Sequence, residues 1–105
     1  MRSRLTSDLA LGPLRLVRER LALEGARHRV ALTQLEFELL WCLGEAGGRL
    51  LSRSEILARV WRDVSGVPTR VVDAHVATLR RKLARGGAPA RIEAVRGIGY
   101  RLDVR

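Results

Sequence analysis

Two neighbouring stretches in the last third of the chain carry side chains that could bind a polyanion. Residues 70–83 have the spacing of an amphipathic helix rich in arginine, and residues 95–101 place Arg96 beside Gly97 and Gly99. A basic helix fits the major groove of DNA, and an arginine at the tip of a short hairpin reaches the neighbouring minor groove. The two stretches together therefore predict contacts to duplex DNA.

The predicted helix around this stretch, residues 69–84 with Thr69 as N-cap, has two distinct faces. Successive residues turn by about 100°, which places four aliphatic side chains on one core stripe: Val72, Val76, Leu79 and Leu83. The opposite face collects Arg70, Ala74, Ala77, Arg81 and, at its edge, Thr78. Small side chains in its middle let this face sink into a groove, while the arginines meet phosphates on the walls. A merely solvated basic face, the alternative, leaves the arginine-tipped hairpin unexplained.

The charge of the chain favours the same kind of partner. Twenty Lys and Arg against eleven Asp and Glu give a net charge of +9 on 105 residues. The excess lies mainly in the second half, where residues 53–105 hold 12 basic and 5 acidic side chains, against 8 and 6 in residues 1–52. A field of this sign on so small a body attracts nucleic acid. We therefore expect the binding face in the second half.

Local patterns predict the elements that must position these groups. Leucine and valine alternate with other residues over residues 8–32, which predicts a small antiparallel sheet, and residues 1–7 are predicted to be a linker. Thr33 with Glu36 and Ser52 with Glu55 have the spacing of capping boxes, which start helices. The predicted elements after the sheet are helices over residues 33–46, 52–62 and 69–84, a loop over residues 63–68 and a hairpin over residues 91–104. The fold class is therefore α+β.

Other chemistries find no support in the sequence. Cys42 is the single cysteine and cannot form an internal disulfide, and neither His28 nor His75 has neighbours at metal-ligand spacing. Phosphate-binding loops, nucleophile elbows and paired acidic sites are missing, so we expect no enzyme, no cofactor and no metal. No apolar run approaches the roughly 20 residues that span a bilayer. The sequence predicts a cytoplasmic domain without a membrane partner.

Four segments in this order resemble the winged-helix effector domain of OmpR/PhoB-type bacterial response regulators. Residues 32–40 (LTQLEFELL) and 51–61 (LSRSEILARVW) look like the first two helices of that family. Residues 70–83 (RVVDAHVATLRRKL) resemble its recognition helix, and residues 95–102 (VRGIGYRL) its wing. The resemblance implies a winged helix-turn-helix with an N-terminal antiparallel sheet, three helices and a C-terminal β-hairpin wing.

The resemblance also implies roles for individual residues in transcription regulation. The third helix would enter the major groove with Thr78 at a base-reading position and Ala74 on the same face. Phosphate contacts are implied for Arg70, His75, Arg80 and Arg81, and, from the two ends of the second helix, for Arg53 and Trp61. Arg96 matches the wing arginine that enters the minor groove. Ala77 and Thr78 replace longer polar or basic residues that are frequent in the family, so direct base readout is expected to be sparse. Ala94 stands where a wing threonine of the family commonly contacts phosphate.

The partners that the resemblance implies extend beyond DNA. The loop Asp63, Val64, Ser65, Gly66 and Val67 occupies the place where family members can meet RNA polymerase. A receiver domain, absent from these residues, would be expected in the full-length protein, as part of a two-component system. The isolated chain is expected to be a monomer that pairs head to tail on direct repeats of double-stranded DNA.

A second hypothesis remains open at this point. A winged helix can instead serve as a protein-interaction or structural module whose basic face binds an acidic partner or RNA. The two hypotheses differ in geometry, because DNA binding requires Arg70, Arg81 and Arg96 on one surface at groove spacing.

Overall fold

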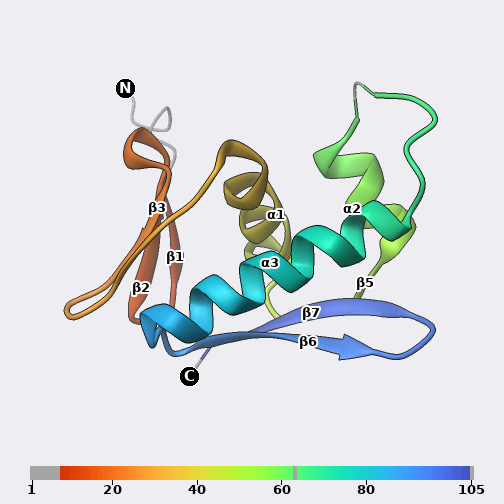
Figure 1. The fold of residues 1–105 in the computed structure, drawn as a ribbon. Coiled ribbons are helices and arrows are strands. Elements are labelled where there is room, and N and C mark those ends of the chain that lie inside the picture. Colours follow the sequence, from red (N-terminus) through yellow and green to blue (C-terminus); the bar gives the residue numbers. More distant parts are fainter. Residues whose placement is uncertain (1–7, 63, 105) are drawn as a thin grey trace.

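The computed structural model describes residues 8–62 and 64–104. The predicted linker over residues 1–7 and Asp63 lie outside the described residues. The chain forms an α+β fold, drawn in Figure 1, in which two antiparallel sheets enclose three helices. Its elements are β1 (Asp8–Leu11), β2 (Leu14–Val17), the 3-10 helix η2 (Arg18–Arg20), β3 (Ala22–Glu24), β4 (Arg29–Ala31), α1 (Gln34–Glu45), β5 (Leu51–Ser52), α2 (Arg53–Val60), α3 (Arg70–Gly86), β6 (Ala90–Val95) and β7 (Gly99–Val104).

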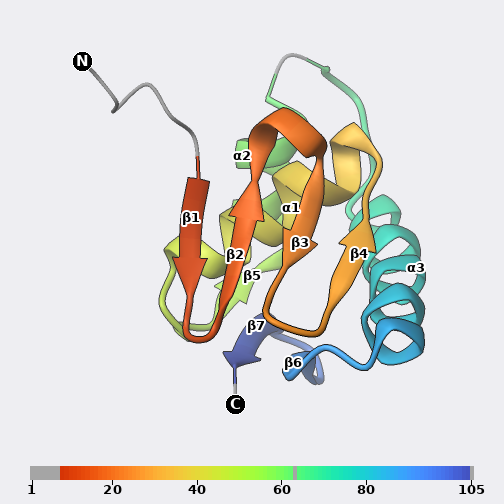
Figure 2. The same ribbon diagram turned by 90° about the vertical axis from the view of Figure 1, so that its left-hand side faces the viewer.

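The N-terminal sheet has four strands in the order β1-β2-β3-β4, each antiparallel to the next. Leu16 pairs with Leu23, and Leu23 with Val30, so that these buried side chains lie across from one another at the centre of the sheet. Figure 2 shows this sheet in front of the helices. The predicted small antiparallel sheet is confirmed.

Both predicted capping boxes are present in the structure. The amide of Glu36 donates to the Thr33 hydroxyl at 3.2 Å, and the amide of Thr33 donates to the Glu36 carboxylate at 2.9 Å. Ser52 and Glu55 exchange the same two bonds at 3.0 Å each. Such a cap satisfies backbone donors that the first turn of a helix leaves unpaired, so α1 and α2 begin where their sequences predict.

The other helix boundaries differ from the predictions by a few residues. Trp61 is the C-cap of α2, so this helix ends at Val60, two residues before the predicted end. The third helix continues to Gly86 and ends because Gly87 adopts a left-handed conformation, with φ +66°. Thr69 is the N-cap residue of α3, but its backbone is helical and its side chain makes no capping bond, so the predicted Thr69 cap is wrong in that respect.

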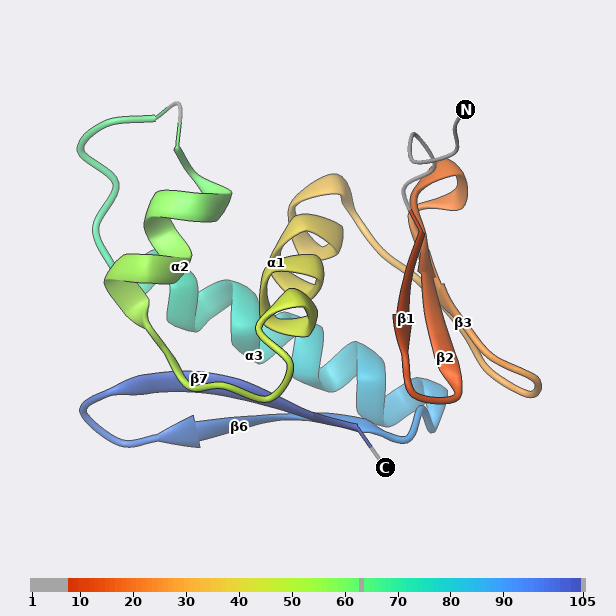
Figure 3. The ribbon, with the colours of Figure 1, turned by 180° about the vertical axis from the view of Figure 1, so that it is seen from behind.

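The core lies between the two sheets and collects the apolar faces of all three helices. Val72, Val76, Leu79 and Leu83 are buried, which confirms the predicted core stripe of the third helix. They pack in one cluster with Phe37 and Leu40 of α1 and with Ile56 of α2. Seen from behind in Figure 3, α1 lies between α2 and the N-terminal sheet, with α3 beyond them.

A buried ion pair joins α1 to α3 at the edge of this core. Glu36 is only 4% exposed, and its carboxylate accepts a 2.6 Å hydrogen bond from Lys82 Nζ, which also donates to the Ala31 carbonyl. Burial raises the pKa of Glu36, but the bonds from Lys82 and Thr33 outweigh it, and the pKa lies below its usual value. One carboxylate thus caps α1 and holds α3 against it.

The second sheet contains a strand that the sequence analysis did not predict. β5 pairs with β7, and β7 with β6, with Leu51 opposite Tyr100 and Ser52 opposite Gly99. Ser52 is also the N-cap of α2, so the C-terminal hairpin is hydrogen-bonded directly to the residue that starts this helix. The hairpin β6–β7 with its turn at residues 96–98 is called the wing below.

The two wing glycines are required for different reasons. Replacing each of them by alanine is therefore expected to change the stability of the domain by different amounts. A Cβ on Gly99 would lie 1.9 Å from the Leu51 carbonyl oxygen, whereas a Cβ on Gly97 would meet nothing within 4 Å. Gly99→Ala is therefore expected to lower the free energy of unfolding by about 3 kcal/mol, the upper range for overpacking. Gly97→Ala, which strains only a left-handed turn, should cost about 1 kcal/mol. Urea denaturation followed by tryptophan fluorescence checks this, and equal midpoints for the two variants would contradict it.

Candidate nucleic-acid interface

The surface face of α3 carries the residues that the sequence placed there. Arg70, Ala74, Ala77 and Arg81 are exposed, and Thr78 is half-buried at the edge. The face is free because the core stripe turns the opposite side of the helix inward. The result is a helix surface that is small in the middle and cationic toward its ends.

The hydroxyl of Thr78 is already engaged within this face. It donates to the Ala74 carbonyl at 3.3 Å and accepts a 3.3 Å bond from Arg81 Nη2. Both bonds are long, so a stronger partner can displace them. The methyl group of Thr78 remains an apolar contact for a thymine methyl group.

Arg80, for which the resemblance implies a phosphate contact, also has a structural role. Its Nε donates a 2.9 Å hydrogen bond to the Ile92 carbonyl of β6. This bond holds the wing against α3, and it leaves the terminal guanidinium nitrogens for an anion. Sequence periodicity could not predict the hydrogen bond from Arg80 to Ile92, because Ile92 belongs to a separate element.

Trp61 and His75 lie together where α2 ends beside α3. Their rings are 5.3 Å apart at an edge-to-face angle of 68°. His75 Nδ1 lies 3.0 Å from the Val71 carbonyl and so donates to it, which orients the ring. Nε2 is the other ring nitrogen, and it can donate to a phosphate only when the ring is an imidazolium. The sequence analysis considered Trp61 and His75 separately, and the structure places their rings in contact.

A three-residue cluster connects the start of α2, the first turn of α3 and β7. Arg53 Nε donates to Asp73 Oδ1 at 2.7 Å, and the Tyr100 hydroxyl donates to the same oxygen. The Arg53 guanidinium also lies 5.6 Å from the centre of the Tyr100 ring. The Tyr100 bond, and then the Arg53 charge, outweigh partial burial and lower the pKa of Asp73.

Sequence reasoning identified Arg53 in this cluster but missed Asp73. Tyr100, the third member of the cluster, is buried. An acidic residue in the first turn of an otherwise basic helix was the available signal. Its partners lie 20 and 27 positions away in the chain, so local spacing could not identify them.

The wing ends in an exposed turn. The amide of Ile98 donates to the Val95 carbonyl at 2.9 Å, and Gly97 has φ +77°. This positive φ at the third turn position is what a type II turn requires. Arg96 and Ile98 are exposed, and Arg96 makes no hydrogen bond or ion pair within the described part of the chain. Arg96 therefore projects from the tip of the wing.

The wing tip and the start of α3 lie at the same end of the molecule, as Figures 1 and 3 both show. The Asp73 cluster and the Arg80 bond hold α3 and the wing together. Arg70, on the first turn of α3, and Arg96 are thus presented at one end, with Arg81 farther along the same helix face.

The loop between α2 and α3 is largely exposed. Val64, Ser65 and Gly66 are at the surface, and Val67 is half-buried. Val64 is 56% exposed, unusual for so apolar a side chain. Within the described residues, no helix is long and apolar enough to cross a membrane.

Comparisons with known proteins identify similar sequences. A family model described as the C-terminal region of transcriptional regulatory proteins matches residues 27–102. The transcriptional regulatory protein CseB of Streptomyces coelicolor is 42% identical over 94 residues, covering 90% of this chain and 38% of CseB. The PhoP regulator of alkaline phosphatase synthesis in Bacillus subtilis is 34% identical over 97 residues, covering 91% of this chain and 40% of PhoP. The chain therefore spans about two fifths of these relatives.

Solved structures of similar domains have the same fold. The DNA-binding domain of the response regulator AdeR, in complex with an intercistronic region, superposes with a TM-score of 0.77 and 25% identity, covering 91% of this chain and 98% of that one. The DNA-binding domain of Klebsiella pneumoniae RstA, in complex with the RstA box, gives a TM-score of 0.71 and 30% identity. The two alignments cover 90% of this chain and 95% of the RstA chain.

The hydrogen bond from Tyr100 to Asp73 can be tested by removing one oxygen atom. Tyr100→Phe is expected to raise the pKa of Asp73 toward its usual value, because the variant loses the largest of the interactions that lower it. A depressed pKa stabilises the fold above the unfolded-state pKa, and this contribution disappears as pH falls through the folded-state value. The stability difference between wild type and variant should therefore narrow in acid. Carbon-13 NMR titration and thermal unfolding measure both effects, and an unchanged Asp73 pKa would contradict the assignment.

Proposed function

This chain belongs to the family of C-terminal domains of transcriptional regulatory proteins, and from that membership we propose that it binds duplex DNA sequence-specifically to regulate transcription. The observation that carries the proposal is the pairing of a small, arginine-ended face on α3 with an exposed Arg96 at the adjoining wing tip. Relatives that superpose on this chain were solved in complex with DNA. As proposed, this function involves no cofactor or metal.

In the proposed complex, α3 lies in the major groove. Ala74 and Ala77 allow close approach to the base edges, and Thr78 supplies the side chain for base readout, through its methyl group or a freed hydroxyl. Arg70 and Arg81 meet phosphates on the groove walls, where they position the helix without reading sequence. The exposure of these residues supports this arrangement.

Further phosphate contacts come from groups that the protein itself holds in place. Arg53 is fixed by Asp73, and His75 is oriented by its bond to Val71 and by the edge of Trp61. A cation that is ordered before binding loses less side-chain entropy when it meets a phosphate. Arg80 contributes through its terminal nitrogens while its Nε keeps the wing in place.

The partners of the whole protein extend the proposal. We propose a receiver domain in the full-length protein and phosphorylation control through it, in keeping with the length of the relatives. The loop with exposed Val64 is proposed to contact RNA polymerase. We propose that the chain is a cytoplasmic monomer in isolation and pairs head to tail on direct repeats spaced about one helical turn, since one domain covers only a short site.

The salt dependence of binding tests the proposed function. Neutralising about four to six phosphates should give a slope of about −4 to −5 for log affinity against log salt. Fluorescence anisotropy with a labelled duplex, selected from a random library at stated salt, measures this slope. A scrambled duplex of the same length is the control, and preference for the selected duplex is expected. A flat salt response, or equal affinity for an acidic peptide and the duplex, would overturn DNA binding in favour of a protein-interaction module.

The wing arginine can be tested separately, because Arg96 is exposed and forms no hydrogen bond or ion pair among the described residues. Arg96→Ala should leave the thermal midpoint nearly unchanged and weaken DNA binding by about 1–3 kcal/mol. The loss should be larger when the wing-side flank is an A-tract, whose narrow minor groove concentrates negative potential. The test is to measure the affinities of the wild type and the variant for matched DNA sites that have either A·T-rich or G·C-rich flanks. A variant that keeps full affinity and flank preference would show that the wing has no role in DNA reading.

A further inference from the structure

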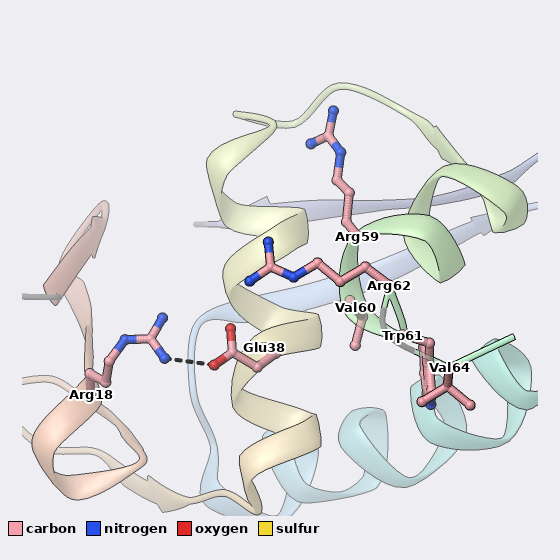
Figure 4. A pocket seen from close by; sticks show the side chains of 7 residues that line it. All are labelled: Arg18, Glu38, Arg59, Val60, Trp61, Arg62 and Val64. Carbon is pink, nitrogen blue, oxygen red and sulfur yellow. Dashed lines mark hydrogen bonds and ion pairs between the residues drawn. The ribbon is translucent and has the colours of Figure 1, made fainter.

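A cleft of about 510 Å³ lies on α1, between η2 of the N-terminal sheet and the C-terminal end of α2. Arg18 and Glu38 line one side of it, and Arg59, Arg62 and Val64 line the other (Figure 4). The proposed DNA contacts use the exposed face of α3 and the wing tip, and of those residues only Trp61 also borders the cleft. The cleft is therefore a second charged surface with its own composition.

One wall of the cleft is rigid and electrically balanced. Arg18 Nη1 lies 2.6 Å from Glu38 Oε2, which also accepts a bond from the Gln34 amide at 2.8 Å. The Arg18 guanidinium sits 4.7 Å and 4.8 Å from the ring centres of Phe37 and Trp41. These contacts fix Arg18 and pair its charge before any ligand arrives.

The opposite wall carries cations that are not balanced in this way. Arg59 and Arg62 are exposed, and neither forms an ion pair among the residues that the structure describes, although Arg59 lies near the Cys42 thiol and the Glu55 carboxylate. Figure 4 shows Arg62 extending across the cleft toward α1, whereas Trp61 turns toward α3. Arg59 in the last turn of α2 and Arg62 just beyond its C-cap can bind carboxylates through paired N–H donors.

The cleft also has an apolar border next to these cations. Val60 and Val64 line it together with Trp61, and Val64 is 56% exposed. An exposed aliphatic side chain beside two exposed arginines matches a ligand that carries both a carboxylate and an apolar side chain. We propose that this cleft binds an acidic segment of a partner protein in which glutamate or aspartate stands next to a leucine-like residue.

The composition of the cleft favours such a segment over other anions. Glu38 is already paired with Arg18, so the positive charge open to a ligand is limited to one side of the cleft, which suits a few carboxylates better than the continuous charge of a nucleic-acid backbone. A nucleic-acid backbone also has no group that matches the apolar border. The amino-terminal residues 1–7 of this chain carry two arginines and no carboxylate, so their charge does not match the site. An acidic peptide meets both the cations and the apolar border.

A labelled probe peptide tests the proposal on the intact chain. The probe is a fluorescein-labelled peptide of about ten residues in which pairs of glutamate alternate with leucine. Arg59→Gln combined with Arg62→Gln should weaken its binding about five- to tenfold, the effect of two partly exposed ion pairs. The matched control combines Arg27→Gln with Arg91→Gln, which removes the same charge from exposed arginines elsewhere. This control should change peptide affinity less than twofold.

Four further measurements decide how the result is interpreted. A glutamine-for-glutamate peptide and a serine-for-leucine peptide should each bind more weakly than the probe, and unchanged thermal midpoints show that the variants are folded. Affinity for a selected DNA duplex should stay within twofold in the Arg59/Arg62 variant, and the probe should bind the DNA-bound chain as well as the free chain. Equal losses in both double variants would overturn the proposal in favour of unspecific attraction. Competition between probe and duplex would assign the cleft to the nucleic-acid surface instead. Neither result depends on which DNA sequence is recognised.

Discussion

The carboxylate of Asp73 accepts hydrogen bonds from Arg53 at the start of α2 and from Tyr100 on β7, while its own backbone belongs to the first turn of α3. Three elements that the sequence separates by 20 and 27 residues therefore meet at one oxygen atom. A helix that enters a groove and a hairpin that reaches the next groove must keep a fixed distance and angle. The Asp73 cluster supplies that constraint at the wing end of α3, and the Arg80 bond to Ile92 supplies a second one farther along the helix.

The acidic residues of the domain pair with some of its basic side chains and leave others without an ion pair. Six carboxylates of the described residues hold basic side chains in ion pairs: Glu24, Glu36, Glu38, Glu55, Asp73 and Glu93. Most of these pairs are partly exposed and contribute little stability each, whereas the pair of buried Glu36 with half-buried Lys82 joins two helices. Exposed arginines outside these pairs lie on the α3 face, at the wing tip and beside the α2 cleft, and others, such as Arg27 and Arg91, lie elsewhere on the surface.

Local signals in the sequence were sufficient for the helix starts and the core. The two capping boxes and the stripe from Val72 to Leu83 depend on residues within one turn or one face, where spacing decides the contacts. The strand β5 has only two residues, and it exists because Gly99 allows the backbone of Leu51 to approach closely. The role of Asp73, the hydrogen bond from Arg80 to Ile92 and the contact between Trp61 and His75 were not predictable either. Each depends on a partner in another element, which periodicity does not identify.

The anchoring of the wing at Gly99 and Tyr100 separates the hairpin into a fixed base and a replaceable end. Ladder bonds to β5 and the bond to Asp73 act at the base, while residues 96–98 contact nothing in the core. Changes at Arg96 and Ile98 therefore have little effect on folding, so the proposed DNA contact of the wing and the stability of the domain can evolve independently. Relatives can differ in wing chemistry by exchanging these two side chains while the turn glycine stays constant. The same property makes this turn a suitable graft site for an engineer who wants altered flank preference without redesigning the core.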